Sequence, residues 1–309
     1  MCRGACRNGS RARSAPMPGP EAIVAQSGLS REKTLAAGRV FLRKAGVEAA
    51  EEDARLLLIG ACRINRLALV TGADVAVSLD EAHRYRSFLD RRAGGEPASR
   101  ILGRRAFWTL DLEVRPGVLD PRGDTEAVVR LALRVADRNG APRRVLDLGC
   151  GSGAILCALL MEFGTASGLG VDLSAEACAA TASNIVLCGL GDRASVAQGR
   201  WCDGVSGAFD LIVSNPPYIP GGEIAALDRE VRDHDPRTAL DGGRDGLDAY
   251  REIFADAPRL LAPGGAIVAE FGLGQAEDVE KLAIASGLRK IDGERDLGVR
   301  DRASAFVVA

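Results

Sequence analysis

The fold is decided by one short stretch, Val145-Leu146-Asp147-Leu148-Gly149-Cys150-Gly151-Ser152-Gly153, in which an apolar run enters a glycine-rich turn. The apolar run 145–148 predicts a buried strand, and residues 154–163 predict the helix that follows the turn. Three alternating glycines allow a sharp bend and let a ligand approach the main chain closely. The stretch therefore predicts a ligand-binding edge of an α/β sheet. The alternative is a turn that only packs the helix on the sheet.

An acidic residue, Asp172, ends the next predicted strand, where a carboxylate can accept hydrogen bonds from both hydroxyls of a ribose. The turn departs from the dinucleotide fingerprint, because its third glycine comes one residue early. Asp147, just before the turn, would also repel a pyrophosphate. These features predict S-adenosylmethionine rather than NAD as the ligand.

A second motif, Ser214-Asn215-Pro216-Pro217-Tyr218, follows the predicted strand 209–213 and so lies at the same edge of the sheet. Two successive prolines make this segment stiff. The Asn215 side-chain oxygen and the Pro216 carbonyl can accept both N–H bonds of a planar NH₂ group, which directs its lone pair toward an incoming methyl group. Tyr218 would stack on that group. Catalysis would then consist of positioning and electrostatic stabilisation; the alternative is a simple proline-rich turn.

The composition excludes several classes of protein. The 309 residues include 40 Lys and Arg against 42 Asp and Glu, a net charge of −2, which disfavours stable binding to nucleic acid. The 8 cysteines form no C-x-x-C pair and the chain has only 2 histidines, so no metal site is predicted. No run of about 18 apolar residues indicates a membrane span. We expect a cytoplasmic protein with reduced thiols.

Four regions follow one another along the chain. We expect a disordered tail at 1–25, a helical domain at 26–95, a hairpin-like connector at 96–120 and an α/β domain at 121–309. In the last region strands alternate with helices, which predicts a mostly parallel sheet with helices on both faces.

Smaller features refine these regions. In the helical domain, Ser30 is the expected N-cap of the first helix, and Asp80 that of a later helix ending at Gly94. Two late apolar stretches, near Leu288 and at 305–308, are expected to close the sheet as an antiparallel pair.

The glycine turn, Asp172 and the Asn-Pro-Pro-Tyr motif, in this order, resemble the Rossmann-like class I amino-methyltransferases, which act on DNA adenine, rRNA guanine or protein glutamine. Flanking segments resemble more specifically the HemK/PrmC-type glutamine methyltransferases, which modify the Gly-Gly-Gln loop of peptide-chain release factors. The resemblance covers about residues 30 to 309. The segments that carry it are Glu96-Pro97, Ile101-Leu102-Gly103, Phe107-Trp108, Pro121 to Glu126, Asp235-Pro236, Ala239-Leu240, Gly242-Gly243, Asp245 to Leu247, Tyr250-Arg251, Glu270 to Gly272 and Gln275.

The resemblance implies a role for individual residues. Trp201 would lie beside the adenine, while Asn215 to Tyr218 would hold the substrate glutamine, with Asn215, Pro216 and Tyr218 as the catalytic groups. The helical domain would contact class 1 release factors, and we expect a monomer. The residues expected to bind S-adenosylmethionine are Gly149, Cys150, Gly151, Ser152, Gly153, Asp172, Trp201 and Asn215, with Phe107, Thr125 and Glu126 closing over it.

Three positions depart from the family pattern. Asp120 replaces an apolar residue and Gly123 a proline, so the connector is expected to be looser. Arg200 stands where an acidic residue usually reads the adenine amino group, and an arginine cannot accept that hydrogen bond. Asp203 or a backbone carbonyl would have to substitute, or the affinity for the cofactor would be lower.

Two alternative functions stay open at this point. One is a DNA or rRNA amino-methyltransferase that uses the same Asn-Pro-Pro-Tyr loop. The other is a catalytically degenerate methyltransferase fold that acts as a binding protein.

Overall fold

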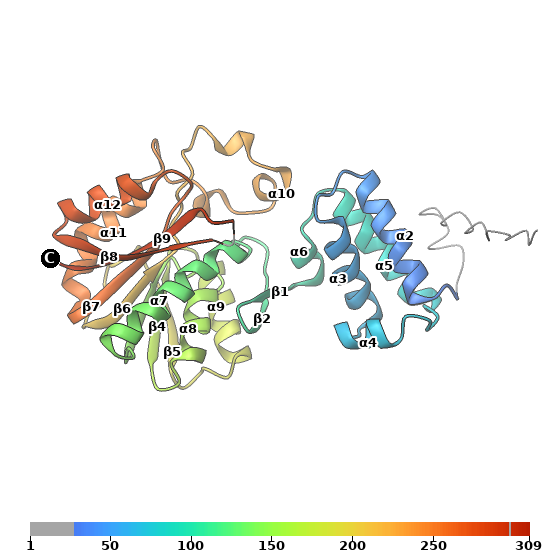
Figure 1. Cartoon of the computed structure of the whole chain (residues 1–309), viewed down its shortest axis with the longest axis horizontal. Helices are drawn as coiled ribbons and strands as arrows, with labels where there is room; N and C mark the ends of the chain where they lie inside the picture. The colour runs from blue at the N-terminus through green and yellow to red at the C-terminus, as the bar shows by residue number, and fades with distance from the viewer. Residues whose placement is uncertain (1–27, 297) are drawn as a thin grey trace, which may run out of the picture. The chain divides into compact units, whose positions relative to one another are not determined.

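The computed structural model describes residues 28–296 and 298–309. The chain divides into two compact units between Ile101 and Leu102, and Figure 1 shows the elements of each. The tail expected to be disordered, residues 1–25, lies outside the described residues. Among the described residues, no helix has both the length and the apolar character needed to cross a membrane.

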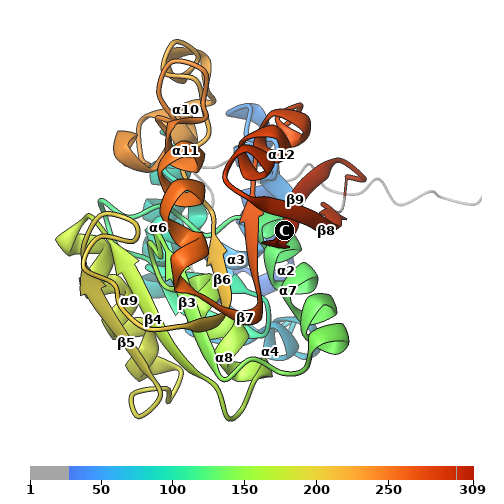
Figure 2. The same cartoon turned by 90° about the vertical axis from the view of Figure 1, so that its left-hand side faces the viewer.

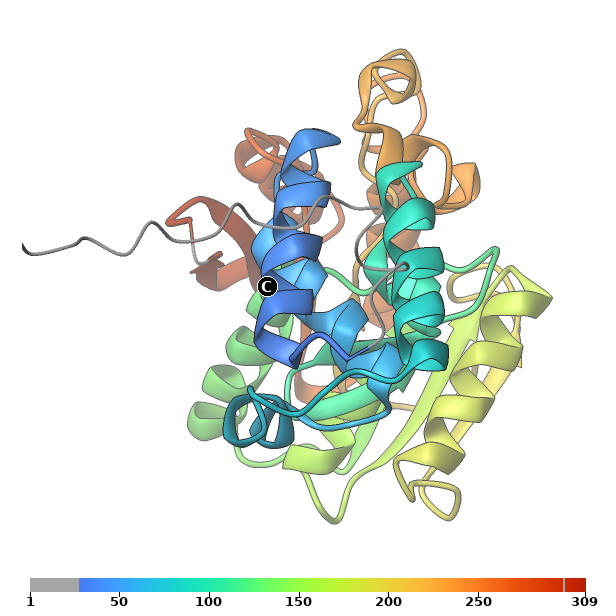
Figure 3. The same ribbon diagram turned by 90° about the vertical axis from the view of Figure 1, so that its right-hand side faces the viewer.

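The first unit is helical, as predicted. Helices α2, α3 and α5 pack against one another (Figure 3) around fully buried side chains that include Leu58, Tyr85 and Leu89. The hydroxyl of Tyr85 donates a hydrogen bond to the Ala54 carbonyl at 3.0 Å, so the buried phenol is satisfied. The helices of this unit are α2 (Arg31–Lys44), α3 (Ala50–Cys62), α4 (Arg66–Thr71), α5 (Leu79–Ala93) and α6 (Ala98–Leu102).

One of the two predicted helix caps is confirmed and the other is wrong. Ser30 caps α2, as predicted. The prediction that Asp80 caps α5 is wrong, because Ser78 is the N-cap: its hydroxyl accepts from the Glu81 amide, and the Glu81 carboxylate accepts from the Ser78 amide. This reciprocal capping box satisfies two free amides, which a cap at Asp80 would not. The short α4 and α6 were not expected, and α6 lies inside the region predicted as a hairpin-like connector.

The second unit begins with the expected hairpin, β1 (Arg104–Phe107) and β2 (Leu110–Glu113). A seven-stranded sheet follows in the order β5-β4-β3-β6-β7-β9-β8. Strands β3 to β7 are parallel, whereas β9 pairs antiparallel with both β7 and β8. The predicted antiparallel closure is confirmed. The strands are β3 (Arg144–Leu148), β4 (Ser167–Asp172), β5 (Ala194–Gln198), β6 (Phe209–Ser214), β7 (Leu261–Glu270), β8 (Leu288–Arg295) and β9 (Asp301–Val308).

Helices cover both faces of the sheet, as expected for this alternation (Figure 2). One face packs against α7, α8 and α9 and the other against α11 and α12. Helix α11 ends at Asp256, and a 3-10 turn that contains Pro258 follows it. These helices are α7 (Glu126–Asn139), α8 (Ala154–Glu162), α9 (Ala175–Leu187), α11 (Asp248–Asp256) and α12 (Ala276–Ala285).

The strand order reverses at β3, whose neighbours are β4 and β6. Ligands of open α/β sheets bind outside the carboxyl ends of the strands at such a switch point. The glycine turn follows β3 and the Asn-Pro-Pro-Tyr loop follows β6. The topology therefore brings the two predicted motifs to one place.

Candidate functional site

The glycine turn connects β3 to α8 as predicted. Gly149, Gly151 and Gly153 have φ of 72°, 58° and 77°, a region that favours glycine. The Gly149 and Cys150 amides donate to the Val171 carbonyl at 2.8 and 3.1 Å. On the open side of Gly151, no heavy atom lies within 4 Å of where a Cβ would stand. The turn is thus held from one side and free on the other, where a ligand can reach the main chain.

Asp172 lies at the end of β4, beside the turn. Its carboxylate accepts from the Gly151 amide at 2.8 Å and from the Ser174 amide at 2.9 Å. Ser174 also caps α9, because its hydroxyl accepts from the Ala177 amide. Because a carboxylate has about four lone-pair positions, two hydrogen bonds leave acceptor capacity for a ligand's hydroxyls. Asp172 therefore links the end of β4 to the turn and keeps acceptor capacity for a ligand.

Asp147 is completely buried beneath the turn. Its Oδ2 accepts from the Leu156 amide at 3.2 Å, while Oδ1 has no hydrogen-bond partner among the described residues. Burial raises the pKa of this carboxyl to about 7, although the Leu156 hydrogen bond opposes the shift. A buried acceptor without a partner is costly unless a donor arrives with a ligand. This orphan oxygen suits a ligand that carries an amine and not one that carries a pyrophosphate.

Trp201 packs over the turn, with a ring carbon 3.0 Å from where a Cβ on Gly149 would stand. The aromatic residue predicted beside the adenine is therefore next to the turn. The neighbouring Arg200 is directed to α11, where it makes two hydrogen bonds of 2.7 and 2.6 Å with Glu252. This ion pair explains how Arg200 is accommodated, and it does not replace the missing acceptor for an adenine amino group.

The three residues predicted to close over the cofactor have other contacts in this structure. Phe107 is buried in the core between the hairpin and the helices of one sheet face. Glu126 accepts from the Trp108 amide at 3.0 Å. Thr125 contacts Asn215 across the site. Their contact with a cofactor stays a prediction.

The Asn-Pro-Pro-Tyr loop leaves the end of β6. The Ser214 hydroxyl donates to the Leu148 carbonyl at 2.7 Å and so ties the ends of β6 and β3 together. The Asn215 side-chain nitrogen donates to the Thr125 hydroxyl at 3.0 Å. Since that nitrogen is engaged, the Asn215 side-chain oxygen is the group left to accept from a substrate. The orientation is the one that binding of an NH₂ group requires.

Segments from later in the chain hold the loop rigid. The Gln275 side chain donates to the Tyr218 carbonyl at 2.9 Å and accepts from the Gly272 amide at 2.9 Å. The Ile219 amide donates to the Leu240 carbonyl at 3.0 Å. At Gly246, with φ of 79°, a Cβ would stand only 2.3 Å from the Tyr218 carbonyl oxygen. The loop is thus clamped by backbone and side chain together.

One buried group at the site was quoted in the sequence without a role. Glu270 ends β7, is 1% exposed, and has a pKa that burial raises to about 7. Its Oε1 accepts from the Tyr218 hydroxyl at 3.5 Å. The sequence contains a signal for this residue, because Glu270 is a single carboxylate at the end of an apolar strand, as Asp172 is at the end of another.

Two connector residues, Asp120 and Gly123, depart from the family pattern and still fit the structure. Asp120 lies near a charged side chain, and Gly123 faces open space. Asp120 is 1% exposed, and its carboxylate lies 3.8 Å from the Arg105 guanidinium. The Asp120 amide donates to Asp235, which also pairs with Arg122. At Gly123, no heavy atom lies within 4 Å of where a Cβ would stand. Asp235 was also quoted in the sequence without a role.

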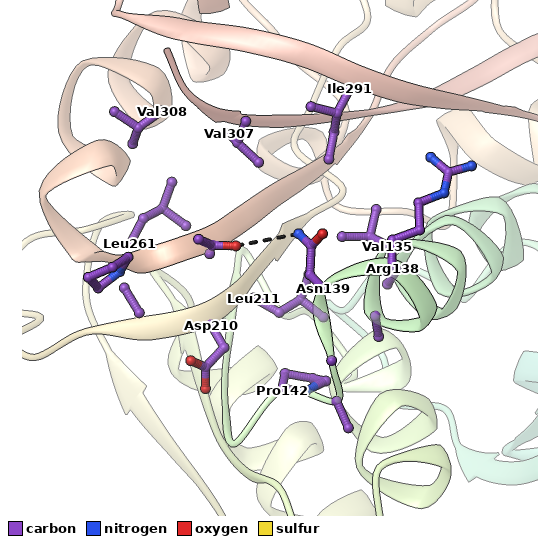
Figure 4. A pocket seen from close by; sticks show the side chains of 18 of the residues that line it. Val135, Arg138, Asn139, Pro142, Asp210, Leu211, Leu261, Ile291, Val307 and Val308 are labelled. Atoms are coloured by element: carbon purple, nitrogen blue, oxygen red, sulfur yellow. Dashed lines mark hydrogen bonds between the residues drawn. The ribbon is translucent and has the colours of Figure 1, made fainter.

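One groove of the second unit lies away from the predicted site residues. A groove of about 790 Å³ lies near the amino ends of β6 and β7, with Asn139 and Leu261 in its lining (Figure 4). None of the predicted site residues lines it. Among the described residues, no group of three or more metal-ligating side chains is present.

A comparison with known structures identifies the fold. The unit resembles the crystal structure of the hMettl16 catalytic domain, with a TM-score of 0.51, 16% identity, and coverage of 65% of this chain and 77% of that one. At this identity the likeness concerns the fold alone. The seven-stranded sheet with its glycine turn is the Rossmann-like methyltransferase fold.

The family is shown by closer relatives. Residues 33–103 match the PrmC N-terminal domain, and residues 123–231 match the methyltransferase small domain. A release factor glutamine methyltransferase of Rhodospirillum rubrum is 45% identical over 284 residues, covering 92% of this chain and 87% of that protein. One of Bradyrhizobium diazoefficiens is 46% identical over 268 residues, covering 86% and 89%. The chain belongs to the release factor glutamine methyltransferase family.

Proposed function

We propose that this protein transfers a methyl group from S-adenosylmethionine to the side-chain amide nitrogen of the glutamine in the Gly-Gly-Gln motif of class 1 peptide-chain release factors. Support comes from the family, whose relatives cover both units of the chain. The observation that carries the proposal is the orientation of Asn215, whose side-chain oxygen is left to accept from a substrate amide.

The residues around the turn fit the methyl donor. Asp172 would bind the ribose hydroxyls, Trp201 would lie beside the adenine, and the free Asp147 Oδ1 would meet the amine of the amino-acid portion, directly or through water. The remaining turn residues, Gly149 to Gly153, would contact it through the main chain. When bound, S-adenosylmethionine supplies an electrophilic methyl carbon on a sulfonium sulfur.

The loop would prepare the nitrogen that accepts the methyl group. An amide nitrogen is a weak nucleophile because its lone pair is delocalised into the carbonyl. The Asn215 side-chain oxygen and the Pro216 carbonyl would accept its two N–H bonds, and Tyr218 would stack on the amide plane. The nitrogen would then gain one bond to the methyl carbon as that carbon's bond to the sulfonium sulfur breaks, with S-adenosylhomocysteine as the leaving group, and the nitrogen would afterwards lose one proton to solvent. Positioning and fixed dipoles do this work without a charged base.

The helical unit would contact the release factor, since it matches the PrmC N-terminal domain. We further propose a cytoplasmic location, where release factors act, a monomeric enzyme, and no stable complex with nucleic acid. The nearly balanced charge supports the last point.

The test is incubation of the full chain with labelled S-adenosylmethionine and a release factor whose Gly-Gly-Gln glutamine is intact or replaced by alanine. We expect label on the intact factor only. Transfer to DNA or RNA instead would overturn the proposed substrate. If calorimetry detected no binding of S-adenosylmethionine, the chain would be a degenerate binding protein.

A second measurement tests the role of the loop. Asn215→Ala should lower turnover about 10²-fold to 10³-fold, because a positioned acceptor in the transition state is lost. Binding of S-adenosylmethionine should stay largely intact. An equal loss of both would show that Asn215 acts on the cofactor site instead.

A further inference from the structure

Helix α9 presents two buried polar side chains to the glycine turn. Thr181 and Asn184 are three residues apart on one face of this helix, and both are 0% exposed. The Thr181 hydroxyl donates to the Gly151 carbonyl at 3.0 Å, and the Asn184 side-chain nitrogen donates to the Ser152 carbonyl at 2.9 Å. Two consecutive carbonyls of the turn are therefore bound by side chains of α9.

These two carbonyls lie just outside α8. The first turn of that helix uses the Gly153 carbonyl, which accepts from the Cys157 amide at 2.9 Å. A buried carbonyl without a donor is costly, so the side chains of α9 satisfy groups that the helix does not. The approach is close, since a Cβ on Gly153 would stand 2.9 Å from the Thr181 methyl carbon. Helix α9 thus contacts the turn through hydrogen bonds and through packing.

The same two bonds set the directions of amides in the turn. A peptide unit is planar and trans, so its carbonyl and the next N–H point in opposite directions. With the Ser152 carbonyl bound to Asn184, the amide that follows donates to the Cys150 carbonyl at 2.7 Å and closes the turn. With the Gly151 carbonyl bound to Thr181, the Ser152 amide points away from Thr181. Among the residues that the structure describes, this amide has no hydrogen-bond partner, so it is free for an acceptor on a ligand.

Asn184 also holds the connector. Its side-chain oxygen accepts from the Glu113 amide at 2.8 Å, and its nitrogen donates to the Glu113 carbonyl at 3.1 Å. Glu113 is the last residue of β2, so Asn184 pairs with the hairpin as a neighbouring strand would. A flipped amide would place its NH₂ against an amide and its oxygen against two carbonyls, so only one orientation fits. Further along the connector, Val118 packs against Ala177 and Ala180 of α9.

We propose that Thr181 and Asn184 are positioning residues for the binding of S-adenosylmethionine. They hold the glycine turn so that the Ser152 amide faces the cofactor, and Asn184 links the turn to the connector through Glu113. Because coupling between two regions is reciprocal, binding at the turn also orders β2. This inference rests on the proposed cofactor site and extends it to two side chains that do not contact the cofactor themselves.

Substitution of Thr181 tests the hold on the turn. Thr181→Val keeps the shape of the side chain and removes the hydroxyl. We expect the Kd for S-adenosylmethionine to rise about fivefold to tenfold, while kcat at saturating cofactor changes less than about twofold, because the substrate loop is not altered. Thr181→Ser, which restores the hydroxyl, should return the Kd to within about threefold of the wild type. Calorimetry measures Kd, and steady-state kinetics measures kcat.

The matched control is Thr34→Val in the helical unit, where a residue that is 2% exposed donates its hydroxyl to the Ser30 carbonyl at 3.0 Å. This variant loses the same kind of hydrogen bond, so a general loss of stability, measured by urea denaturation, would be common to both. Only Thr181→Val should change the Kd for S-adenosylmethionine. An unchanged Kd in Thr181→Val, an equal rise in Thr34→Val, or no rescue by Thr181→Ser would overturn the inference.

Hydrogen exchange tests the link between the turn and the connector. In the wild-type chain, saturating S-adenosylmethionine should slow exchange of the Glu113 amide by about threefold or more relative to amides of β8, at the far edge of the sheet. In Asn184→Ala this slowing should disappear at saturating cofactor. Slowing that persists in the variant would mean that the cofactor orders the connector directly, and no slowing in the wild type would mean that the two are not coupled. Either result would overturn the role of Asn184, and the wild-type comparison holds even if Asn184→Ala does not fold.

The outcomes distinguish this inference from the proposed function. If the wild-type chain methylates the Gly-Gly-Gln glutamine and Thr181→Val binds S-adenosylmethionine as the wild type does, the inference is wrong and the function stands. If the wild-type chain binds no S-adenosylmethionine, the proposed function fails, and the inference fails with it.

Discussion

The two halves of the site contrast at one glycine in each half, Gly151 and Gly246. In the half formed by β3 and β4, Gly151 faces open space, with no heavy atom within 4 Å of where its Cβ would stand. In the half formed by β6 and β7, Gly246 is crowded, because a Cβ there would stand 2.3 Å from the Tyr218 carbonyl oxygen. The open half leaves room for a ligand. The crowded half makes the substrate loop rigid.

The largest expected effect comes from the crowded half. In Gly246→Ala, the new Cβ would collide with the Tyr218 carbonyl and the Gln275 side chain, and the φ of 79° would be strained for alanine. We expect kcat to fall more than about 100-fold, since a displacement of about 1 Å is enough for such a loss. Steady-state kinetics with a release factor and calorimetry with S-adenosylmethionine measure the two halves separately. Unchanged kcat would show that the loop is not rigidly clamped.

The open half should respond in the complementary way. Gly151→Ala meets no protein atom, although the φ of 58° is costly for alanine, and its methyl group would occupy the ligand's side of the turn. We expect the Kd for S-adenosylmethionine to rise about 10-fold to 30-fold, with kcat at saturation nearly unchanged. A loss of kcat with normal binding would erase the distinction between the halves.

A third substitution, at Glu270, tests the half of the site formed by β6 and β7 through its effect on the free energy of unfolding. The pKa of Glu270 is raised from 4.5 to about 7 in the folded chain, so the folded state holds its proton more tightly than the unfolded state. The contribution of this group to stability is therefore present at pH 4 and is lost as the pH rises to about 7. Glu270→Gln should gain on the order of 1 kcal/mol of unfolding free energy at pH 8 and little at pH 5. Urea denaturation at both pH values checks this; a larger gain at pH 5 would contradict the sign.

The smallest effect is expected at the rim of the open half. Arg200 and Glu252 have side chains that are 53% and 41% exposed, and exposed pairs contribute about 0–1 kcal/mol. Arg200→Ala should therefore change the unfolding free energy by less than about 1 kcal/mol. The Kd for S-adenosylmethionine should change less than about threefold, because the arginine is directed to α11. A larger change in Kd would place Arg200 at the cofactor.

The two halves also differ in how far the sequence alone could predict them. The glycine turn and Asp172 were predictable because backbone requirements and a strand-end carboxylate lie within one short β-turn-α-β segment. The position of the Asn-Pro-Pro-Tyr loop was predictable because the loop directly follows an apolar strand, whose carboxyl end lies at the same edge of the sheet. Its clamps were not, because Gln275, Gly246 and Glu270 come from distant parts of the chain and act through tertiary contacts. Family resemblance marked these residues without giving their roles.

Local chemistry also explains two errors of detail in the elements. The cap of α5 was placed at Asp80 although the Ser78 and Glu81 pair was visible in the sequence. Strand β5, Ala194–Gln198, was missed because it is an edge strand with largely exposed side chains and no apolar run. In both cases the sequence pattern was a weaker indicator of structure than the apolar periodicity of a buried segment.

The place of β9 in the sheet has a consequence for how the substrate half assembles. This strand comes after β8 in the chain but lies between β7 and β8, and it carries Arg302, whose guanidinium pairs with Asp124 at 3.3 Å, next to Thr125. Strand β8 is joined to β7 only through β9. Folding of this edge must therefore wait for a segment synthesised more than 80 residues after the loop itself. A chain interrupted before β9 could form the glycine turn and still lack a completed methyl-accepting site.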